Sequence, residues 1–159
     1  MMAAYKLSLA VQYGINSGLI PERAQFRRWI NAALQRDACI TLRIVDEKEG
    51  RALNKNFCGK DRATNVLTFV HEEVGILYGD IAICSPVVER EAHDHHKDIQ
   101  AHYAHLAIHA VLHLQGYDHN KVADANRMEA LEAALLMKLG YADPYQAVNL
   151  PSKDGSTRE

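Results

Sequence analysis

HAVLHLQGYDH, residues 109–119, places histidines at offsets of 0, 4 and 10 and a glycine at offset 7. Two histidines four residues apart share one face of a helix, so their rings can bind the same ion. Gly116 ends the helix and lets the chain turn back to present a third ligand. Three nitrogen ligands leave one tetrahedral position open, as in catalytic zinc sites. The stretch therefore predicts a helix, a turn and a catalytic metal on His109, His113 and His119.

The residues around this stretch also favour a ligand role for its histidines. Ile108, Val111 and Leu112 give the stretch an apolar flank. An unliganded imidazole is unfavourable in such surroundings, whereas a dry environment helps a metal ion to act on its water. All nine histidines lie within residues 71–119, where even spreading would place about three. The alternative is a set of surface or core histidines that share this spacing by chance.

The residue after the first histidine indicates which kind of bond would be cleaved. The offsets match HExxHxxGxxH of the metzincin proteases, but Ala110 stands where those enzymes have a glutamate. That glutamate is the general base of peptide hydrolysis and contributes roughly 10²–10⁴-fold. Cleavage of a phosphodiester depends less on the carboxylate, because a metal ion can activate a hydroxide or a ribose 2′-hydroxyl. A phosphoryl substrate is therefore favoured over a peptide.

Four segments, in the right order, resemble the YbeY family of bacterial rRNA maturation factors. HAVLHLQGYDH is close to the family signature HGxLHLxGYDH, GKDRATNVLTF to GKDxxTNVLSF, GDIAIC to GDIxI, and GYADPY to the family's C-terminal end. The resemblance implies a zinc-dependent, single-strand-specific endoribonuclease that acts in 16S rRNA 3′-end maturation and ribosome quality control. It also implies one Zn²⁺ per chain on His109, His113 and His119, with RNA and the ribosome or its small-subunit proteins as partners.

Three positions depart from the family pattern. Ala110 replaces a glycine, which a helix accepts, and Val70 replaces a proline, which we interpret as a local loop difference. Cys58 replaces an arginine that precedes GKD and is associated with function in the family. Its loss removes a cation that could hold a phosphate or stabilise a pentavalent transition state. The alternative function is a non-catalytic, metal-containing ribosome-assembly factor that binds rRNA or ribosomal proteins.

A local basic segment is the candidate RNA-binding surface. Lys55, Lys60 and Arg62, with Arg51 behind them, outnumber Asp61, the only acidic residue among them. Such a segment could track a phosphate backbone, or it could be a solvated loop without special meaning. Lys60 or Arg62 could also replace the missing arginine. A second candidate surface on the first predicted helix consists of Arg23, Arg27 and Arg28.

Other polar residues near the signature have more than one interpretation. His102 and His105 precede His109 on one helical stripe. They could lie behind the ligands, they could face RNA, or they could be partly exposed at the mouth of the site. We favour the partly exposed position. The tract HDHHKD, residues 93–98, resembles a metal tract only in composition and predicts a solvated helix end. Asp118 either orients a ligand or caps the following helix.

The charge and cysteine content limit the class of protein. The net charge of −2 removes the global basic footprint of many nucleic-acid binders, although the first half of the chain is positive and the second negative. No DNA partner is expected. Three cysteines without a CxxC pair favour a reducing compartment. The N-terminal segment lacks a signal-peptide pattern, and no apolar run is long enough for a membrane span. We expect a cytoplasmic protein.

The 159 residues are enough for one domain that folds without a metal. We expect this domain over residues 1–150 and a disordered tail over residues 151–159. Period-2 and helical patterns predict strands over 5–11, 39–45, 65–70 and 77–84, and helices over 21–36, 47–56, 85–96, 98–115 and 121–139. This order predicts an α+β domain with a small mixed four-stranded sheet, and it places the metal site on a helix of the C-terminal half and the turn that follows.

Overall fold

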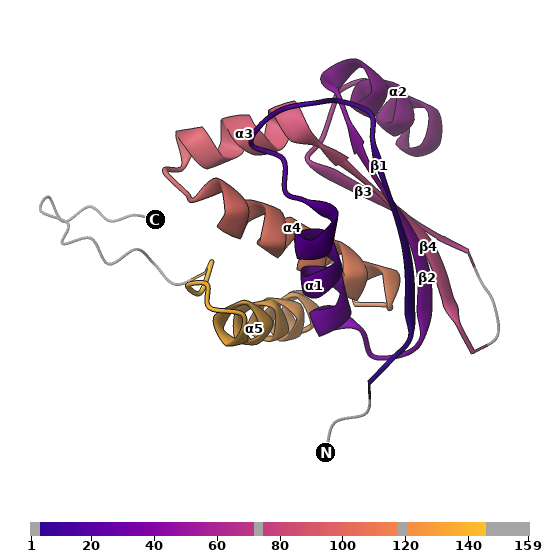
Figure 1. Ribbon diagram of the computed structural model, residues 1–159, viewed down its shortest axis with the longest axis vertical. Helices are drawn as coiled ribbons and strands as arrows, with labels where there is room; N and C mark the ends of the chain where they lie inside the picture. The colour runs from indigo at the N-terminus through magenta and orange to yellow at the C-terminus, as the bar shows by residue number, and fades with distance from the viewer. Residues whose placement is uncertain (1–3, 72–74, 118–120, 146–159) are drawn as a thin grey trace, which may run out of the picture.

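The computed structural model describes residues 4–71, 75–117 and 121–145 (Figure 1). It confirms the α+β class, because a mixed four-stranded sheet packs with five helices in these ranges. The strands are β1 (Leu7–Tyr13), β2 (Ala38–Val45), β3 (Val66–His71) and β4 (Leu77–Cys84). The helices are α1 (Arg23–Ala33), α2 (Glu47–Cys58), α3 (Ser85–Asp94), α4 (Ile99–Leu114) and α5 (Val122–Lys138). Within the described ranges, none of the helices is long and apolar enough to cross a membrane.

The sheet has the order β1-β2-β4-β3, with one covered face and one open face. β2 pairs in parallel with β1 and β4, and β3 joins β4 antiparallel. In β2, Ile40 and Leu42 are buried, whereas Thr41 and Arg43 are only half-buried, because successive strand side chains point to opposite faces. The face of Ile40 carries the core. The face of Thr41 and Arg43 is the open face.

The core lies between the covered face and the helices α1, α4 and α5, which Figure 1 shows on one side of the sheet. Trp29 and Tyr103 are among its largest fully buried side chains. Ten of the 16 residues of α4 are buried. A methyl group added at Gly79 would lie 2.8 Å from Cδ1 of Leu114, so α4 approaches β4 where the strand has no side chain. This contact positions the C-terminal end of α4 against the sheet.

Helix α2 lies at one end of the sheet, next to α3 and away from α1 and α5 (Figure 1). It packs through a separate small cluster in which Leu53 contacts Val45, Cys84 and Val87. As predicted, α2 begins after Asp46, whose side chain accepts a hydrogen bond from the backbone N–H of its third residue at 2.8 Å. The helix therefore rests on the sheet through one narrow stripe and exposes most of its surface.

Several predicted details are wrong at element ends. α1 begins after its N-cap Glu22, so Pro21 precedes the helix instead of opening it. The pair Ser85-Pro86 predicts a helix that Ser85 caps, but Cys84 is the N-cap of α3 and Ser85 is its first residue. Val70 lies within β3, as the strand predicted over 65–70 requires, so the replacement of a proline by Val70 is not a loop difference. In each case the observed boundary lies one or two positions from the one that local residue preferences predict, because the neighbouring strand or the cap geometry determines where the element ends.

Candidate functional site

Helix α4 presents a stripe of four histidines at spacings of three or four residues, namely His102, His105, His109 and His113. The helix begins where the sequence predicts, because the Asp98 side chain accepts a hydrogen bond from the backbone N–H of Ala101 at 2.9 Å. It ends at Leu114, and Gly116 follows with a φ of 104°, a conformation that favours glycine. The predicted helix and turn are therefore confirmed.

His109 and His113 lie one helical turn apart with nearly parallel rings, whose centroids are 6.4 Å apart and whose planes differ by 4°. Nδ1 of His109 lies 2.5 Å from Oε2 of Glu132, and Nδ1 of His113 lies 3.2 Å from the carbonyl oxygen of Tyr117. A carbonyl oxygen and an ionised carboxylate only accept hydrogen bonds, so Nδ1 carries the proton in both rings. The lone pair then sits on Nε2, the arrangement in which a hydrogen-bonded histidine binds a metal.

The pair fits the predicted zinc ion in donor type, spacing and tautomer. The third predicted ligand, His119, and its neighbour Asp118 lie outside the described residues. In the part of the chain that is described, no group of three or more histidine, cysteine, aspartate or glutamate side chains is placed to hold a metal ion. The metal site therefore stays a prediction, and two of its three ligands are described.

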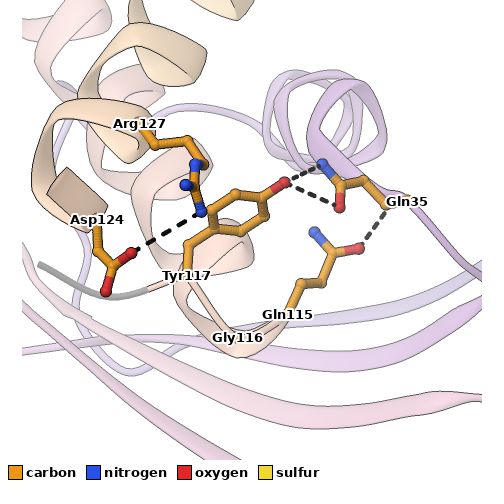
Figure 2. A pocket seen from close by; sticks show the side chains of 6 residues that line it. All are labelled: Gln35, Gln115, Gly116, Tyr117, Asp124 and Arg127. Atoms are coloured by element: carbon orange, nitrogen blue, oxygen red, sulfur yellow. Dashed lines mark hydrogen bonds and ion pairs between the residues drawn. The ribbon is translucent and has the colours of Figure 1, made fainter.

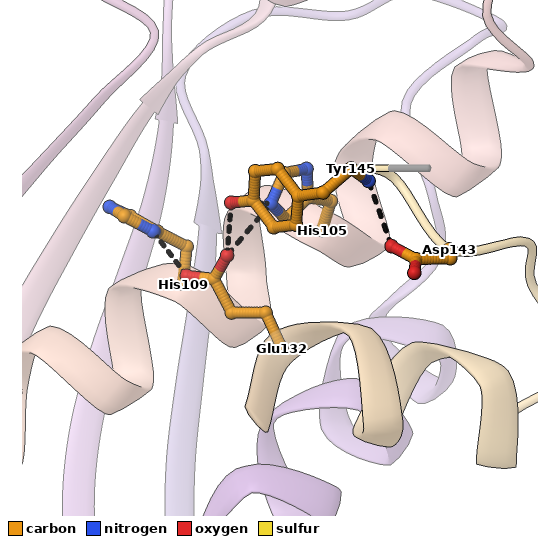
Figure 3. A network of polar contacts seen from close by, with 5 residues as sticks. All are labelled: His105, His109, Glu132, Asp143 and Tyr145. Atoms are coloured by element: carbon orange, nitrogen blue, oxygen red, sulfur yellow. Dashed lines mark hydrogen bonds and ion pairs between the residues drawn. The ribbon is translucent and has the colours of Figure 1, made fainter. Parts of the chain in front are cut away.

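Glu132 of α5 is fully buried behind the histidine stripe (Figure 3). Its Oε2 accepts from His109, and its Oε1 accepts from the hydroxyl of Tyr145 and lies 3.1 Å from Nε2 of His105. Nε2 of His105 also lies 2.9 Å from the Tyr145 hydroxyl oxygen. A carboxylate is tolerated in the interior only when hydrogen bonds replace its water. This network does so, and it joins α4, α5 and residues 141–145.

The protonation states in this network support one another. Burial raises the pKa of Glu132, but the hydrogen bonds from His105, His109 and Tyr145 outweigh it and lower the pKa to about 2. Glu132 is therefore ionised at neutral pH and is a permanent acceptor for His109. Burial, together with the hydrogen bond to this carboxylate, raises the pKa of Tyr145. The hydroxyl of Tyr145 consequently keeps its proton and stays a donor.

The turn after α4 is held by polar contacts to the segment after α1 (Figure 2). The Gln115 side chain accepts from the backbone N–H of Gln35 at 2.7 Å and donates to the carbonyl of Ala33 at 2.9 Å. The hydroxyl of Tyr117 lies 3.0 Å from Nε2 of Gln35. Gln35, Gln115 and Tyr117 form part of the wall of a cavity of about 390 Å³. The residue whose carbonyl orients His113 is thus fixed through its side chain as well.

His102 does not lie at the mouth of the site, so its predicted partial exposure is wrong. It is buried, and its Nε2 lies 2.9 Å from Oε1 of Glu91, which also accepts from Nδ2 of Asn65 at 3.1 Å. Burial lowers the pKa of His102 and outweighs the hydrogen bond to Glu91. His105 is half-buried and contacts Glu132, which places it behind the ligands. The stripe therefore divides into an interior end and a candidate ligand end.

Two of the three predicted RNA-binding residues line one groove. This groove of about 720 Å³ along α2, which we name the basic groove, has the cationic lining residues Lys48, Arg51, Lys55 and Arg62. Its lining also includes two carboxylates, one of which, Asp61, lies 2.7 Å from Nε of Arg51. Lys60 is exposed but does not belong to the groove wall. The structure therefore groups Lys55 and Arg62 and separates Lys60 from them.

Two further predicted positions are exposed. Cys58 is the last residue of α2 and is exposed to solvent. The HDHHKD tract, residues 93–98, ends α3 and is exposed throughout, which confirms the predicted solvated helix end. The imidazoles of this tract therefore do not contribute to the histidine stripe of α4.

The fold and the site together define a class of protein. A histidine pair on a central helix, with one ring oriented by a buried carboxylate and followed by a glycine turn, is typical of metal-dependent hydrolases. Residues 20–140 match the family described as endoribonuclease YbeY. An endoribonuclease YbeY of Nitrosomonas europaea is 52% identical over 140 residues, which cover 88% of this chain and 85% of that protein. One of Thiobacillus denitrificans is 51% identical and covers 91% of this chain and 99% of that protein.

The chain belongs to the YbeY endoribonuclease family. Family membership confirms the resemblance that the signature indicates and, with it, the enzyme class of an endoribonuclease. A solution structure of a Thermotoga maritima protein matches the fold with a TM-score of 0.50 and 24% identity, covering 82% of this chain and 91% of that chain. This likeness concerns the fold alone.

Sequence reasoning did not identify Glu132 and Tyr145 as parts of the site. In the helix predicted over 121–139, helical spacing predicts an apolar face of Met128, Leu131, Leu135 and Leu139, but the fully buried stripe of α5 is Met128, Glu132 and Leu136. A glutamate midway between two buried apolar positions of one helical stripe is the signal that could have revealed a buried carboxylate. Tyr145 has no comparable signal, because its partners lie on other elements.

Proposed function

We propose that this chain is a zinc-dependent, single-strand-specific endoribonuclease. The observation that supports the proposal most is the hydrogen bonding of Nδ1 in His109 and His113, which leaves the lone pairs on Nε2 of both rings. His119 is the proposed third ligand, and the site would hold one Zn²⁺ per chain. When bound, the ion would supply a Lewis acid for the scissile phosphate and would make an attacking water or hydroxyl more acidic.

The residues of the chain fix the ligands and exclude one alternative reaction. Glu132 sets the ring orientation of His109, and the carbonyl of Tyr117 sets that of His113. Ala110, at the position of the peptidase glutamate, is fully buried in the core. The chain therefore offers no general base there, and a carboxylate at this position would have to lie in apolar surroundings. This favours a phosphodiester over a peptide as the substrate.

The basic groove is the proposed contact to the phosphates of RNA. Lys55 and Arg62 belong to its wall, and Lys60 stands exposed beside it. Exposed cations along a helix neutralise a phosphate backbone without reading its sequence. This agrees with an enzyme that does not select a particular base order.

The cellular role is proposed from the family resemblance. The substrate would be the 16S rRNA precursor in 3′-end maturation and ribosome quality control, with the ribosome or its small-subunit proteins as partners in the cytoplasm. Three cysteines without a CxxC pair are compatible with a reducing compartment. We also propose that residues 1–150 form one domain and that residues 151–159 form a tail.

The test measures zinc content and cleavage of single-stranded and duplex RNA for wild type, His113→Ala and the control His93→Ala. His113 is exposed, so its loss should leave circular dichroism unchanged while zinc and cleavage are lost. The ring of His93 is 90% exposed at the end of α3, so the control should behave as wild type. Full zinc occupancy in His113→Ala would contradict the ligand assignment, and an unfolded variant would indicate a structural ion.

Cys58 favours a second candidate function, that of a non-catalytic assembly factor. Its exposed thiol stands where the family has a cation for a phosphate. Cys58→Arg and the control Cys58→Ser are compared with wild type at equal zinc content. Cleavage by Cys58→Arg alone would support the assembly factor. Cleavage by wild type that neither substitution abolishes would support the endoribonuclease.

A further inference from the structure

The open face of the sheet carries a second groove, on the side of α2 that turns away from the basic groove. This groove has a volume of about 580 Å³, and we name it the aromatic groove. Its walls include Leu53 and Phe57 of α2, Phe69 of β3, Arg43 of β2, and Asp80 and Ala82 of β4. Neither the family match nor the histidine site assigns a role to it. Concave apolar sites with a few polar groups are where proteins bind planar ligands.

Two aromatic rings give the groove its stacking surface. Phe57 is 68% exposed, the second highest value among the large hydrophobic side chains of the described residues. Its ring meets that of Phe69 edge-to-face, with centroids 5.3 Å apart and an interplanar angle of 66°. In such an edge-to-face pair the edge of one ring packs on a face of the other, and both rings line the groove. The two rings give the groove an apolar lining that a planar ligand could cover.

The polar groups of the aromatic groove select a neutral ligand with hydrogen-bond donors. Arg43 donates to Glu49 at 2.6 Å and 3.0 Å, so its charge is balanced. Asp80 lies 2.9 Å from Nε2 of His71, and its side chain is 48% exposed. Partly exposed carboxylates repel a phosphate but accept hydrogen bonds from the exocyclic amino group of a base. A nucleobase therefore fits this groove better than its phosphate does.

The two grooves lie on opposite sides of one helix, so a strand that enters both would cross α2. Lys48 and Lys55 of α2 face the basic groove, while Leu53 and Phe57 face the aromatic groove. Cations that follow the backbone, next to aromatic side chains on which bases stack, are the combination with which proteins bind single strands without sequence preference. We propose that the aromatic groove binds an unpaired base of single-stranded RNA while the phosphates follow the basic groove.

This inference rests on the proposed function, because it assigns a surface to the same RNA substrate. It places a binding site for RNA on the face of the sheet opposite the histidine stripe. A duplex would be excluded from this site, because its bases are stacked on one another and cannot enter the groove. The aromatic groove would thus contribute to single-strand selectivity, separately from the metal.

The test measures binding of a labelled single-stranded RNA of about ten nucleotides to the full chain with chelator present, so that no cleavage occurs. Phe57→Ala should weaken binding about tenfold and leave the salt dependence unchanged, because a stacking surface is removed but every cation stays in place. Met137→Ala, which truncates a side chain that is 54% exposed on α5, is the control and should bind as wild type. Phe57→Trp should retain the affinity.

Two further measurements identify the base as the ligand. An abasic oligonucleotide of the same length should bind wild type and Phe57→Ala equally, because the stacking partner is missing from both complexes. In Phe57→Trp, added RNA should quench the new indole fluorescence. The natural tryptophan, Trp29, is fully buried and should not respond.

Equal RNA affinity of wild type, Phe57→Ala and Phe69→Ala would overturn the inference. So would an affinity loss in Phe57→Ala that persists with abasic RNA, since the groove would then contact something other than a base. A groove that binds a protein partner would show no effect of these substitutions on RNA. If zinc-loaded wild type still cleaves RNA in these cases, only the inference fails. If wild type neither binds nor cleaves RNA, the proposed function fails with it.

Discussion

The two faces of the sheet carry their polar groups in opposite ways. Beneath the covered face, Glu132 is fully buried and accepts from two histidines and a tyrosine, and His102 is only 7% exposed. Along α2, beside the open face, polar groups meet mainly as ion pairs in water. Arg51 and Asp61 form such a pair with both side chains more than half exposed.

This difference suits the two sides of the molecule to two tasks, holding ligand atoms in place and binding a flexible chain. A buried acceptor with several donors has one favourable geometry, because moving any donor leaves a polar group without its partner. An exposed ion pair contributes only about 0–1 kcal/mol, is screened by salt and exchanges partners readily. The covered side is therefore suited to hold ligand atoms in place. The α2 side is suited to bind a flexible, charged chain.

The largest expected effect comes from removing the buried carboxylate. Glu132→Ala should lower the free energy of unfolding by about 3 kcal/mol, because several buried donors lose their acceptor. It should also weaken zinc binding by roughly 10–100-fold through the ring of His109. Urea denaturation and a chelator competition measure the two effects.

Glu129→Ala, an exposed position one turn earlier in α5, is the matched control and should change neither quantity. If Glu132→Ala does not fold, Glu132→Gln keeps the volume of the side chain and allows the zinc measurement. Equal zinc affinity in Glu132→Gln and wild type would remove the distinction between the two faces.

On the α2 side, the expected effect is on the salt dependence of RNA binding. The double substitution Lys55→Ala, Arg62→Ala should lower the slope of log affinity against log salt by about 1.4, or about 0.7 for each phosphate that the protein no longer neutralises. Zinc content should stay unchanged, because neither residue is a plausible ligand. RNA affinity at several salt concentrations gives the slope.

Arg27→Ala, Arg28→Ala is the control, because it removes the same charge from α1, the second candidate surface. If this pair changes the slope and the α2 pair does not, RNA binds along α1 and the basic groove has another role.

A smaller effect is expected at the turn after α4. Tyr117→Phe removes the hydroxyl that contacts Gln35 and should weaken zinc binding about two- to fivefold, because the carbonyl that orients His113 is held less firmly. Tyr13→Phe also removes one hydroxyl hydrogen bond, to the carbonyl of Pro21, at a distance from the site. Both variants should lose about 1 kcal/mol of stability, but only the first should change zinc affinity. Equal zinc affinities would show that the turn needs no side-chain support.

The smallest effect is a pH dependence caused by His102. Burial lowers its pKa in the folded state, so below about pH 6.5 the unfolded chain takes up a proton that the folded chain does not. The contribution of His102 to the free energy of unfolding is complete above that pH. It falls by at most about 1.4 kcal/mol per pH unit as the pH decreases towards the pKa of His102 in the folded chain. Between pH 7 and pH 5, the midpoint temperature of thermal unfolding should decrease less in His102→Gln than in wild type. In His96→Gln, which changes an exposed histidine, it should decrease as in wild type. Identical slopes would contradict this origin.

The elements that the sequence predicts best are those whose signal is local. Strand β4 occurs at the predicted residues 77–84, and the turn at Gly116 follows the predicted helix. Both depend on alternation, helical spacing or a positive φ, which neighbouring residues determine. The histidine pair was predictable for the same reason, because an offset of four residues on a helix is itself a geometry.

The contacts that the sequence does not reveal join distant segments. His105 and Glu132 are 27 positions apart, and Gln35 and Gln115 are 80 positions apart. No periodic pattern encodes such a pairing, so these supports of the site became visible only in the fold. The basic groove shows the opposite error, because Lys60 and Arg62 are neighbours in sequence but do not line the same wall.

The contact between Tyr145 and Glu132 also orders events in time. A growing chain delivers α4 first, then α5, and last the segment that carries Tyr145. Synthesis of the 13 residues from Glu132 to Tyr145 takes about 0.6 to 2.6 seconds at typical rates. During this interval the carboxylate lacks one of its donors, although both described ligands have already been made. A nascent chain therefore holds an incomplete site until the segment that carries Tyr145 has been synthesised.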